Sequence, residues 1–227
     1  MTTTAHLTRI QMDPWSRHVG DDLKDVQSLH RRVLALTPDQ HQQSPRQNSG
    51  ILFRLERSRT QHTLLIQSTA PLDLDALPPS YATAIDQRDL TPLLTWCAPG
   101  ATIQYRLDAM ATRSIATQER HEDGRRKRGH RIPVSGADAV TWWQRQAENA
   151  GLTLIPTTLR TTSQPDAVGW KAEHPEANKR IRFGKTITRF EGHAVISSPE
   201  ALRQVITTGI GRARAYGAGL LSIAPTA

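Results

Sequence analysis

The order in which strand-like and helix-like segments follow one another constrains the fold of this chain most, because the same order occurs twice. In the first half, an alternating segment at 5–12 predicts a strand, and apolar residues at helical spacing predict a helix over 22–38. The segments 51–58 and 62–69 predict a hairpin, and 81–86 a further strand. With a proline-bearing connection before the last strand, this order is close to that of a ferredoxin-like domain.

The pattern restarts in the second half. Helices are predicted at 136–152 and at 198–209, the second with Ser198 as N-cap and Gly209 as the C-terminal stop. Strands are predicted at 101–112, 152–159, 185–197 and 219–225, whereas 160–182 is polar and is expected to be irregular. The sequence therefore predicts an α+β fold of two tandem ferredoxin-like domains, over residues 1–95 and 96–227.

The charge balance points to a polyanionic partner. The 227 residues carry a formal charge of +8, which favours nucleic acid, with an anionic membrane surface as the alternative. No apolar run approaches the roughly 18 residues that span a bilayer, and the N-terminal segment has no signal-peptide core. The single cysteine, Cys97, excludes an internal disulfide and a multi-cysteine zinc site. We expect a cytoplasmic protein with no metal and no cofactor.

A glycine-rich stretch, GIGRARAYGAGLLSIAP, follows the last predicted helix, and we call its residues 209–219 the glycine loop. It joins a helix end to a strand, whereas the phosphate loops of mononucleotide and dinucleotide sites open a helix. A helix stop explains Gly209 but not Gly211, Gly217 and Gly219. With Arg212 and Arg214 in the same loop, the pattern predicts a backbone-lined surface that faces phosphates.

This stretch resembles the C-terminal glycine-rich loop of the RAMP superfamily of CRISPR systems. Together with LTRIQMDPWSR and DDLKDVQSLHRRVLAL near the start and the closing unit 188–223, the likeness is closest to the Cas6e branch, the CRISPR RNA endoribonucleases of type I-E systems. It extends over almost the whole chain and implies two tandem ferredoxin-like, RRM-like domains.

The resemblance also implies an activity. We expect metal-independent cleavage of the CRISPR repeat stem-loop in precursor RNA, leaving a 5′-hydroxyl and a 2′,3′-cyclic phosphate. The enzyme would then stay bound to the mature CRISPR RNA, in a Cascade complex with other Cas proteins.

His30 is the candidate catalytic residue. On its own, it fits a boundary histidine of an amphipathic helix, but the resemblance implies the family's catalytic histidine in this helix, and imidazole suits proton transfer near neutral pH. The family often has a tyrosine three residues earlier, where this chain has Gln27, whose amide can position a group but cannot act as an acid or base. A non-catalytic RNA-binding subunit therefore stays an alternative, and a nucleotide-binding enzyme is a further one.

Residues in three places, most of them basic, are assigned to RNA binding. Beside His30 stands Arg31, and the glycine loop contributes Gly211, Arg212, Arg214 and Gly217. A basic segment between a predicted strand and helix is either a solvated loop or a projecting hairpin. The family resemblance implies that it enters the groove of an RNA hairpin. Its candidate residues are Arg125, Arg126, Lys127, Arg128 and Arg131. The stretch 178–185 is a weaker candidate, and Trp142 and Trp143 are expected in the core.

Overall fold

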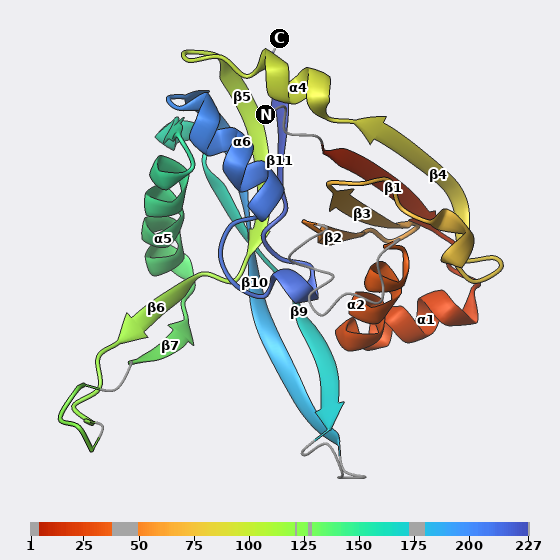
Figure 1. Cartoon of the computed structure of the whole chain (residues 1–227), viewed down its shortest axis with the longest axis horizontal. Helices are drawn as coiled ribbons and strands as arrows, with labels where there is room; N and C mark the ends of the chain where they lie inside the picture. The colour runs from red at the N-terminus through yellow and green to blue at the C-terminus, as the bar shows by residue number, and fades with distance from the viewer. Residues whose placement is uncertain (1–4, 38–49, 121, 127–128, 173–179, 227) are drawn as a thin grey trace.

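The computed structural model describes residues 5–37, 50–120, 122–126, 129–172 and 180–226, and Figure 1 shows two antiparallel sheets side by side. Helices cover one face of each sheet, and a long two-stranded hairpin extends from the second sheet past the helices of the first. The α+β class and the tandem ferredoxin-like arrangement predicted from the sequence are confirmed by the strand orders that follow.

The first sheet has the ferredoxin-like strand order. Its strands, in spatial order, are β2 (Leu52–Arg57), β3 (His62–Ser68), β1 (His6–Met12) and β4 (Ala82–Asp89). The connection from β3 to β4 contains only a short 3-10 turn, η1 (Leu74–Ala76), in the place of a second helix. The predicted strand at 5–12 and the predicted hairpin are therefore confirmed, and the last strand is longer than predicted.

The predicted helix over 22–38 is wrong in extent, because the structure has two helices here. These are α1 (Arg17–Lys24) and α2 (Val26–Ala35). Asp25 separates them with extended backbone angles, and its side chain accepts a hydrogen bond from the backbone N–H of Gln27 at 3.0 Å. An aspartate in that position is a strong N-cap, so α2 begins anew at this residue.

The second sheet repeats the ferredoxin-like order. Its strands, in spatial order, are β11 (Leu221–Pro225), β5 (Thr102–Ala109), β10 (Arg180–Ile196) and β8 (Leu152–Leu154). Its helices are α5 (Gly136–Asn149) and α6 (Pro199–Thr208), the latter capped by the Ser198 side chain as predicted. The predicted strand at 152–159 is too long, because a 3-10 turn, η2 (Pro156–Thr158), ends β8 early.

Residues 160–172 correct the expectation of an irregular segment. They form β9 (Arg160–Ala172), which pairs with β10 from Glu191 to Arg180 in a long antiparallel hairpin. The strand is polar from Arg160 to Gln164, and its sequence lacks the alternation of a half-buried strand. Backbone pairing with β10 supplies the order instead.

A second projection comes from the segment after β5. The predicted strand at 101–112 ends at Ala109, and β6 (Thr112–Ile115) then pairs with β7 (His130–Pro133) in a separate two-stranded ribbon. We call β6, β7 and the loop between them the basic hairpin. Its end points away from both sheets in Figure 1.

Each sheet packs its helices over a core of its own. The first core gathers Ile10, Leu29, Val33 and Leu64, and the second is built around the fully buried Trp143. Trp142 is also buried, so both tryptophans lie in the core as expected. The link between the halves, α4 (Thr91–Trp96), packs Leu94 against the second core. A division at residue 95 stays a prediction.

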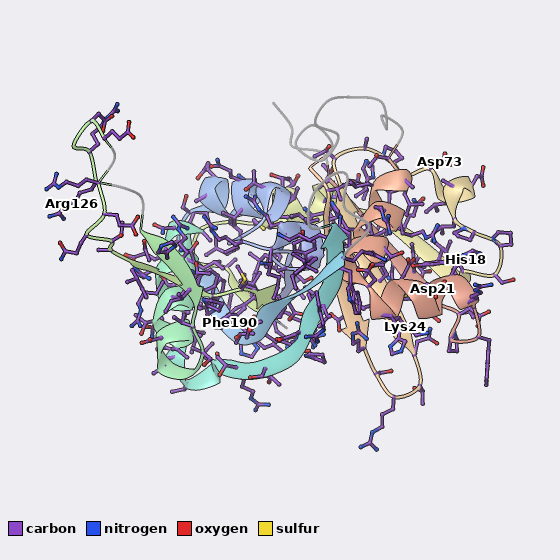
Figure 2. All side chains as sticks on the ribbon, turned by 90° about the horizontal axis from the view of Figure 1, so that it is seen from below. His18, Asp21, Lys24, Asp73, Arg126 and Phe190 are labelled. Atoms are coloured by element: carbon purple, nitrogen blue, oxygen red, sulfur yellow. The ribbon has the colours of Figure 1, made fainter. Side chains whose placement is uncertain are left out.

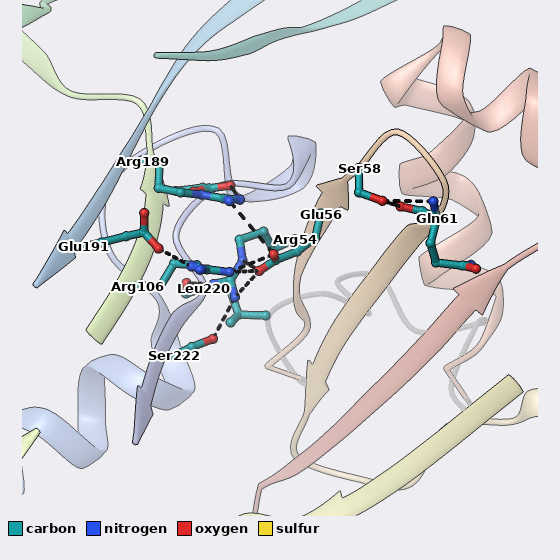
Figure 3. Close-up of polar contacts among 10 residues, drawn as sticks. Arg54, Glu56, Ser58, Gln61, Arg106, Arg189, Glu191, Leu220 and Ser222 are labelled. Atoms are coloured by element: carbon teal, nitrogen blue, oxygen red, sulfur yellow. Dashed lines mark hydrogen bonds and ion pairs between the residues drawn. The ribbon is translucent and has the colours of Figure 1, made fainter. Parts of the chain in front are cut away.

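An ionic cluster joins the two sheets (Figure 3). The buried Arg54 of β2 donates to the Leu220 carbonyl oxygen at 3.1 Å and to Ser222 Oγ at 3.0 Å in the second half. Its neighbour Glu56 accepts from Arg106 Nη1 of β5 at 2.8 Å. A buried arginine with these partners holds β2 against β11, and losing one partner would leave a charge poorly compensated.

Candidate functional site

His30 lies on α2 beside the seam between the two halves. The apolar side of the helix carries Leu29 and Val33 into the first core, which leaves the half-buried His30 at the edge of that face. Its imidazole stacks near the Phe53 ring of β2, with centroids 6.4 Å apart and planes at 20°. On another side it contacts the ring of Tyr216, with centroids 6.3 Å apart and planes at 66°. The helix thus presents the histidine to a residue of the glycine loop.

The glycine loop reaches His30 because its backbone adopts angles that other residues rarely take. After α6 it turns through η3 (Arg214–Tyr216), and Gly217 follows with φ of +84°. A Cβ atom on Gly217 would stand 3.3 Å from Phe53 Cε2, and one on Gly211 3.1 Å from Trp142. The loop therefore packs on both halves through positions where only a glycine fits. A surface that faces phosphates, as the sequence predicted, stays a prediction.

The two arginines of the loop have different positions. Arg212 is exposed, and its backbone forms an isolated bridge with Met110. Arg214 folds back over the loop, and its guanidinium donates to the Thr208 carbonyl oxygen at the end of α6. Its side-chain carbons lie close to Gly209 and Gly219. Arg214 thus braces the loop internally, whereas Arg212 presents its charge to solvent.

The β9–β10 hairpin closes over the start of α2. Arg180 Nη2 lies 3.2 Å from Asp25 Oδ2, and the Trp170 backbone N–H donates to Asp25 Oδ1 at 3.3 Å. Farther along, the Phe183 ring lies 5.0 Å from that of Tyr216, and the Lys185 ammonium stands 5.7 Å from the Phe183 centroid. The rings of His30, Tyr216 and Phe183 therefore form a row across the seam between the two halves. The Lys185 ammonium lies at the Phe183 end of this row.

Gln27 and Arg31 lie on the solvent side of α2. Gln27 is half-buried in the first turn of the helix, and Arg31 is exposed. Arg31 lines an open depression of about 400 Å³ that also carries Lys24 and Arg180. Asp21 and Asp25 line the same depression, and Asp25 pairs with Arg180, so the cations exceed the carboxylates by one. This excess of positive charge would attract a phosphate backbone.

The basic hairpin lies apart from His30. Arg125, Arg126 and Arg131 are exposed, and Arg125 pairs with Asp123 at 2.7 Å, while Lys127 and Arg128 fall outside the described residues. Figure 2 shows Arg126 at the opposite end of the molecule from Lys24 of α1. The structure thus gathers His30, Gln27, Arg31 and the glycine loop, and places the basic hairpin at a distance, as a second surface.

The comparison with protein families settles the relationship of the chain. The model of a family described as CRISPR associated protein matches residues 5–225. The chain belongs to this family. No helix in the described part of the chain has the length and apolar character to cross a membrane. Among the same residues, no group of three or more His, Cys, Asp or Glu could hold a metal ion.

Two curated relatives of this CRISPR-associated chain match over nearly its full length. The CRISPR-associated endoribonuclease Cse3 of Thermus thermophilus is 26% identical over 227 residues, which covers 96% of this chain and 99% of the relative. The CRISPR system Cascade subunit CasE of Escherichia coli is 28% identical over 219 residues, covering 93% and 94% of the two chains.

A solved structure agrees with these relatives. One chain of a CRISPR RNA-guided surveillance complex, captured before nicking, is 31% identical to this chain. It superposes with a TM-score of 0.68 and covers 97% of this chain and 100% of its own. The resemblance that the sequence motifs indicated is thereby confirmed.

Sequence reasoning missed several side chains of this site. Tyr216 stands within the quoted glycine-rich stretch, but only the tertiary structure brings its ring to His30. Phe183 and Trp170 belong to the hairpin that the sequence did not predict as such. The Asp25 N-cap was the one local signal, because an aspartate before VQSLHRR marks a helix start.

Proposed function

We propose that this chain is a metal-independent endoribonuclease that binds the stem-loop of a CRISPR repeat, cuts precursor CRISPR RNA there, and remains bound as a subunit of a Cascade-type complex. Support comes from the relatives, one of which is named an endoribonuclease and another a Cascade subunit, each matched over more than nine-tenths of its length. The cytoplasm, where such transcripts arise, is the proposed location.

One observation carries the assignment to this site. A histidine on α2 meets the glycine loop at the seam of two ferredoxin-like halves, with Arg31, Lys24 and Arg180 along the adjacent edge. Cations there would hold the RNA backbone and stabilise charge on phosphorus, and an imidazole can move a proton at neutral pH.

The chemistry uses the RNA's own hydroxyl. The 2′-oxygen attacks the adjacent phosphorus, and the bond from phosphorus to the 5′-oxygen breaks. The proton of the 2′-hydroxyl is removed and the departing 5′-oxygen gains one, so the products carry a 2′,3′-cyclic phosphate and a 5′-hydroxyl. We assign proton transfer to His30 and positioning to Gln27, whose amide exchanges no proton. Arg31, the exposed Arg212 and the backbone at Gly211 and Gly217 hold phosphates.

The basic hairpin supplies the second RNA surface. Its exposed Arg125, Arg126 and Arg131 project from the second sheet at a distance from His30. An A-form stem is recognised largely by shape and by its phosphates. We place the stem against this hairpin and the end of the stem near α2, with Lys127 and Arg128 as further contacts.

The test is a cleavage assay with the repeat RNA encoded beside the gene, in EDTA, with both product ends mapped. The His30→Ala variant should cut about 10²–10⁴-fold more slowly and bind the RNA as wild type does. His18→Ala, which removes an exposed histidine from the neighbouring α1, is the matched control and should cut normally. Binding without cleavage by the wild-type protein would identify the non-catalytic subunit instead.

A further inference from the structure

A cavity of about 240 Å³ opens at the seam between the two halves. One wall is formed by Val26 and Leu29 of α2 and by Phe53 of β2, and the opposite wall by residues 164–168 of β9. Tyr216 lines it as well. Because Phe53 and Tyr216 are also the ring neighbours of His30, the cavity adjoins the candidate catalytic residue.

The β9 wall of this cavity is irregular. Gln164 pairs with Ile187 and Ala167 with Lys185, so Pro165 and Asp166 together stand opposite one residue of β10. Such a β-bulge interrupts the hydrogen-bond ladder and turns side chains to new directions, and bulges are common beside functional sites. The bulge gives the cavity wall backbone polar groups as well as the side chains of Gln164 and Asp166.

Three carboxylates line the cavity, and two of them are already engaged. Asp22 accepts from Ser28 at 2.7 Å and from Arg32 at 3.1 Å, and Asp108 is paired with Arg189 at 2.7 Å. Within the described part of the chain, no hydrogen bond or ion pair involves Asp166. Its carboxylate, on the bulge, is therefore the acceptor that a ligand can reach.

The dimensions and the chemistry of the walls suit a flat ring. A volume of about 240 Å³ is below the roughly 300–1,000 Å³ of sites for drug-sized ligands, so it suits a base rather than a whole nucleotide. Aliphatic and aromatic side chains cover the faces of a ring, and a carboxylate with an amide recognises its polar edge. Carboxylates accept from the amino group of cytosine and glutamine pairs with adenine, whereas uracil has no exocyclic amine.

We propose that this cavity binds one nucleobase that carries an exocyclic amino group, turned out of the RNA strand beside the phosphodiester that is cut. This inference rests on the proposed function. Turning a base out of its stack costs a few kcal/mol in general and is offset by stacking and by hydrogen bonds in the pocket. Asp166 accepts from the amino group, Gln164 reads the adjacent ring edge, and Phe53 and Tyr216 border the ring.

The first experiment measures affinity for an uncleavable repeat RNA, with a 2′-deoxy nucleotide at the mapped cut. An abasic residue is placed at each of the flanking nucleotides in turn. At one position, it should weaken wild-type binding about 10–100-fold, the range of base stacking on aromatic side chains. Ala167→Trp, which fills the cavity from β9, should bind the intact RNA more weakly and lose no further affinity at that position. Ala84→Trp, on the exposed face of β4, is the control and should keep the full abasic effect.

A second experiment asks which edge is read and does not depend on filling the cavity. Asp166→Ala removes the acceptor. At the sensitive position, the wild-type protein should favour an adenine over a purine without its amino group, and Asp166→Ala should lose that preference, with its melting temperature unchanged.

The results separate the two proposals. A wild-type protein that neither binds nor cuts the repeat RNA would overturn the proposed function. Normal binding and cleavage with equal abasic effects at all positions, or an abasic effect that persists in Ala167→Trp, would overturn the nucleobase site alone. So would an unchanged amino-group preference in Asp166→Ala.

Discussion

The rings of His30 and Tyr216 meet at 66° with their centroids 6.3 Å apart, and they come from the two different halves of the chain. Tyr216 is itself held by the Phe183 ring of β10, at 5.0 Å. The direction of the His30 imidazole therefore depends on the glycine loop and on the long hairpin, as well as on its own helix.

Replacing Tyr216 tests this dependence. Tyr216→Ala removes the ring, and we expect single-turnover cleavage to slow at least about tenfold, because small misplacements of a catalytic group cost up to about 100-fold in rate. Tyr216→Phe keeps the ring and should stay within about threefold of wild type. RNA affinity should change less than the rate in both variants. A wild-type rate for Tyr216→Ala, or equal losses in both variants, would contradict a role for the ring in positioning.

Gly217→Val should impair the site more than it impairs the fold. Valine at φ of +84° is strained and its branches would press on Phe53, beside His30. Gly100→Val is the matched control, since Gly100 has a φ of +81° and a Cβ atom there would meet no other atom within 4 Å. Both variants should melt earlier, but only Gly217→Val should lose cleavage. The measurement is the cleavage rate of each variant at a temperature where both are folded. Equal rates for Gly217→Val and Gly100→Val would show that the loop only connects α6 to β11.

Arg212 and Arg214 should give opposite phenotypes. Arg214→Ala loses the hydrogen bond to the end of α6 and should lower the melting temperature. Arg212→Ala removes an exposed charge and should weaken RNA binding without a change in melting temperature. Affinity and melting temperature are measured for each. A stable but weakly binding Arg214→Ala would show that its charge acts on RNA, as the sequence alone had indicated.

The basic hairpin should contribute through phosphate contacts. Replacing Arg125, Arg126 and Arg131 by alanine should weaken binding and reduce the slope of log affinity against log salt, by roughly 0.7–0.9 for each phosphate that is no longer neutralised. The control replaces two exposed arginines of the first half together, Arg59 in the turn between β2 and β3 and Arg88 of β4, and it should leave the slope nearly unchanged. An identical slope in the triple variant would remove the hairpin from the RNA surface.

Glu56 should link stability to acid pH. Burial alone would raise the pKa of this carboxyl, but Arg54 and Arg106 outweigh it and hold the pKa below its usual value. The stabilisation is therefore complete above the unfolded pKa of about 4.3 and is lost as the pH falls through the lower folded pKa. The melting temperature of Glu56→Gln should be lower than that of wild type near pH 7. As the pH is lowered below about 5, this melting temperature should fall less steeply than that of wild type.

The control for the loss of stability at acid pH is Glu148→Gln, on the exposed face of α5. Its melting temperature should follow the wild-type curve at every pH. If Glu56→Gln also followed that curve, the cluster in Figure 3 would have no part in acid unfolding.

Local signals in the sequence account for the elements that were predicted well. The Ser198 cap and the Gly209 stop bound α6, and alternating apolar residues mark β1. The break at Asp25 was missed because the apolar spacing of α2 was extended backwards through a residue that caps it. β9 was missed because pairing with β10, rather than burial of one face, stabilises it.

The residues of the candidate site also differ in whether a local signal in the sequence marks them. His30 and the glycine loop were found because a family resemblance and a run of glycines are visible along the chain. Tyr216, Phe183 and the Asp25–Arg180 pair were not, because each contact joins residues far apart in sequence. Contacts of this kind depend on the packing of two sheets, which no short window of sequence encodes.

The contact between His30 and residue 216 has a consequence for synthesis of the protein. The helix that bears the histidine leaves the ribosome early, but the residues that orient it, on β10 and in the glycine loop, emerge more than a hundred residues later. A nascent chain can fold its first sheet and expose His30 without the partners that direct its imidazole. Ribosome-bound chains therefore carry His30 before they carry the ring that contacts it, and this contact forms only when residue 216 is free to pack.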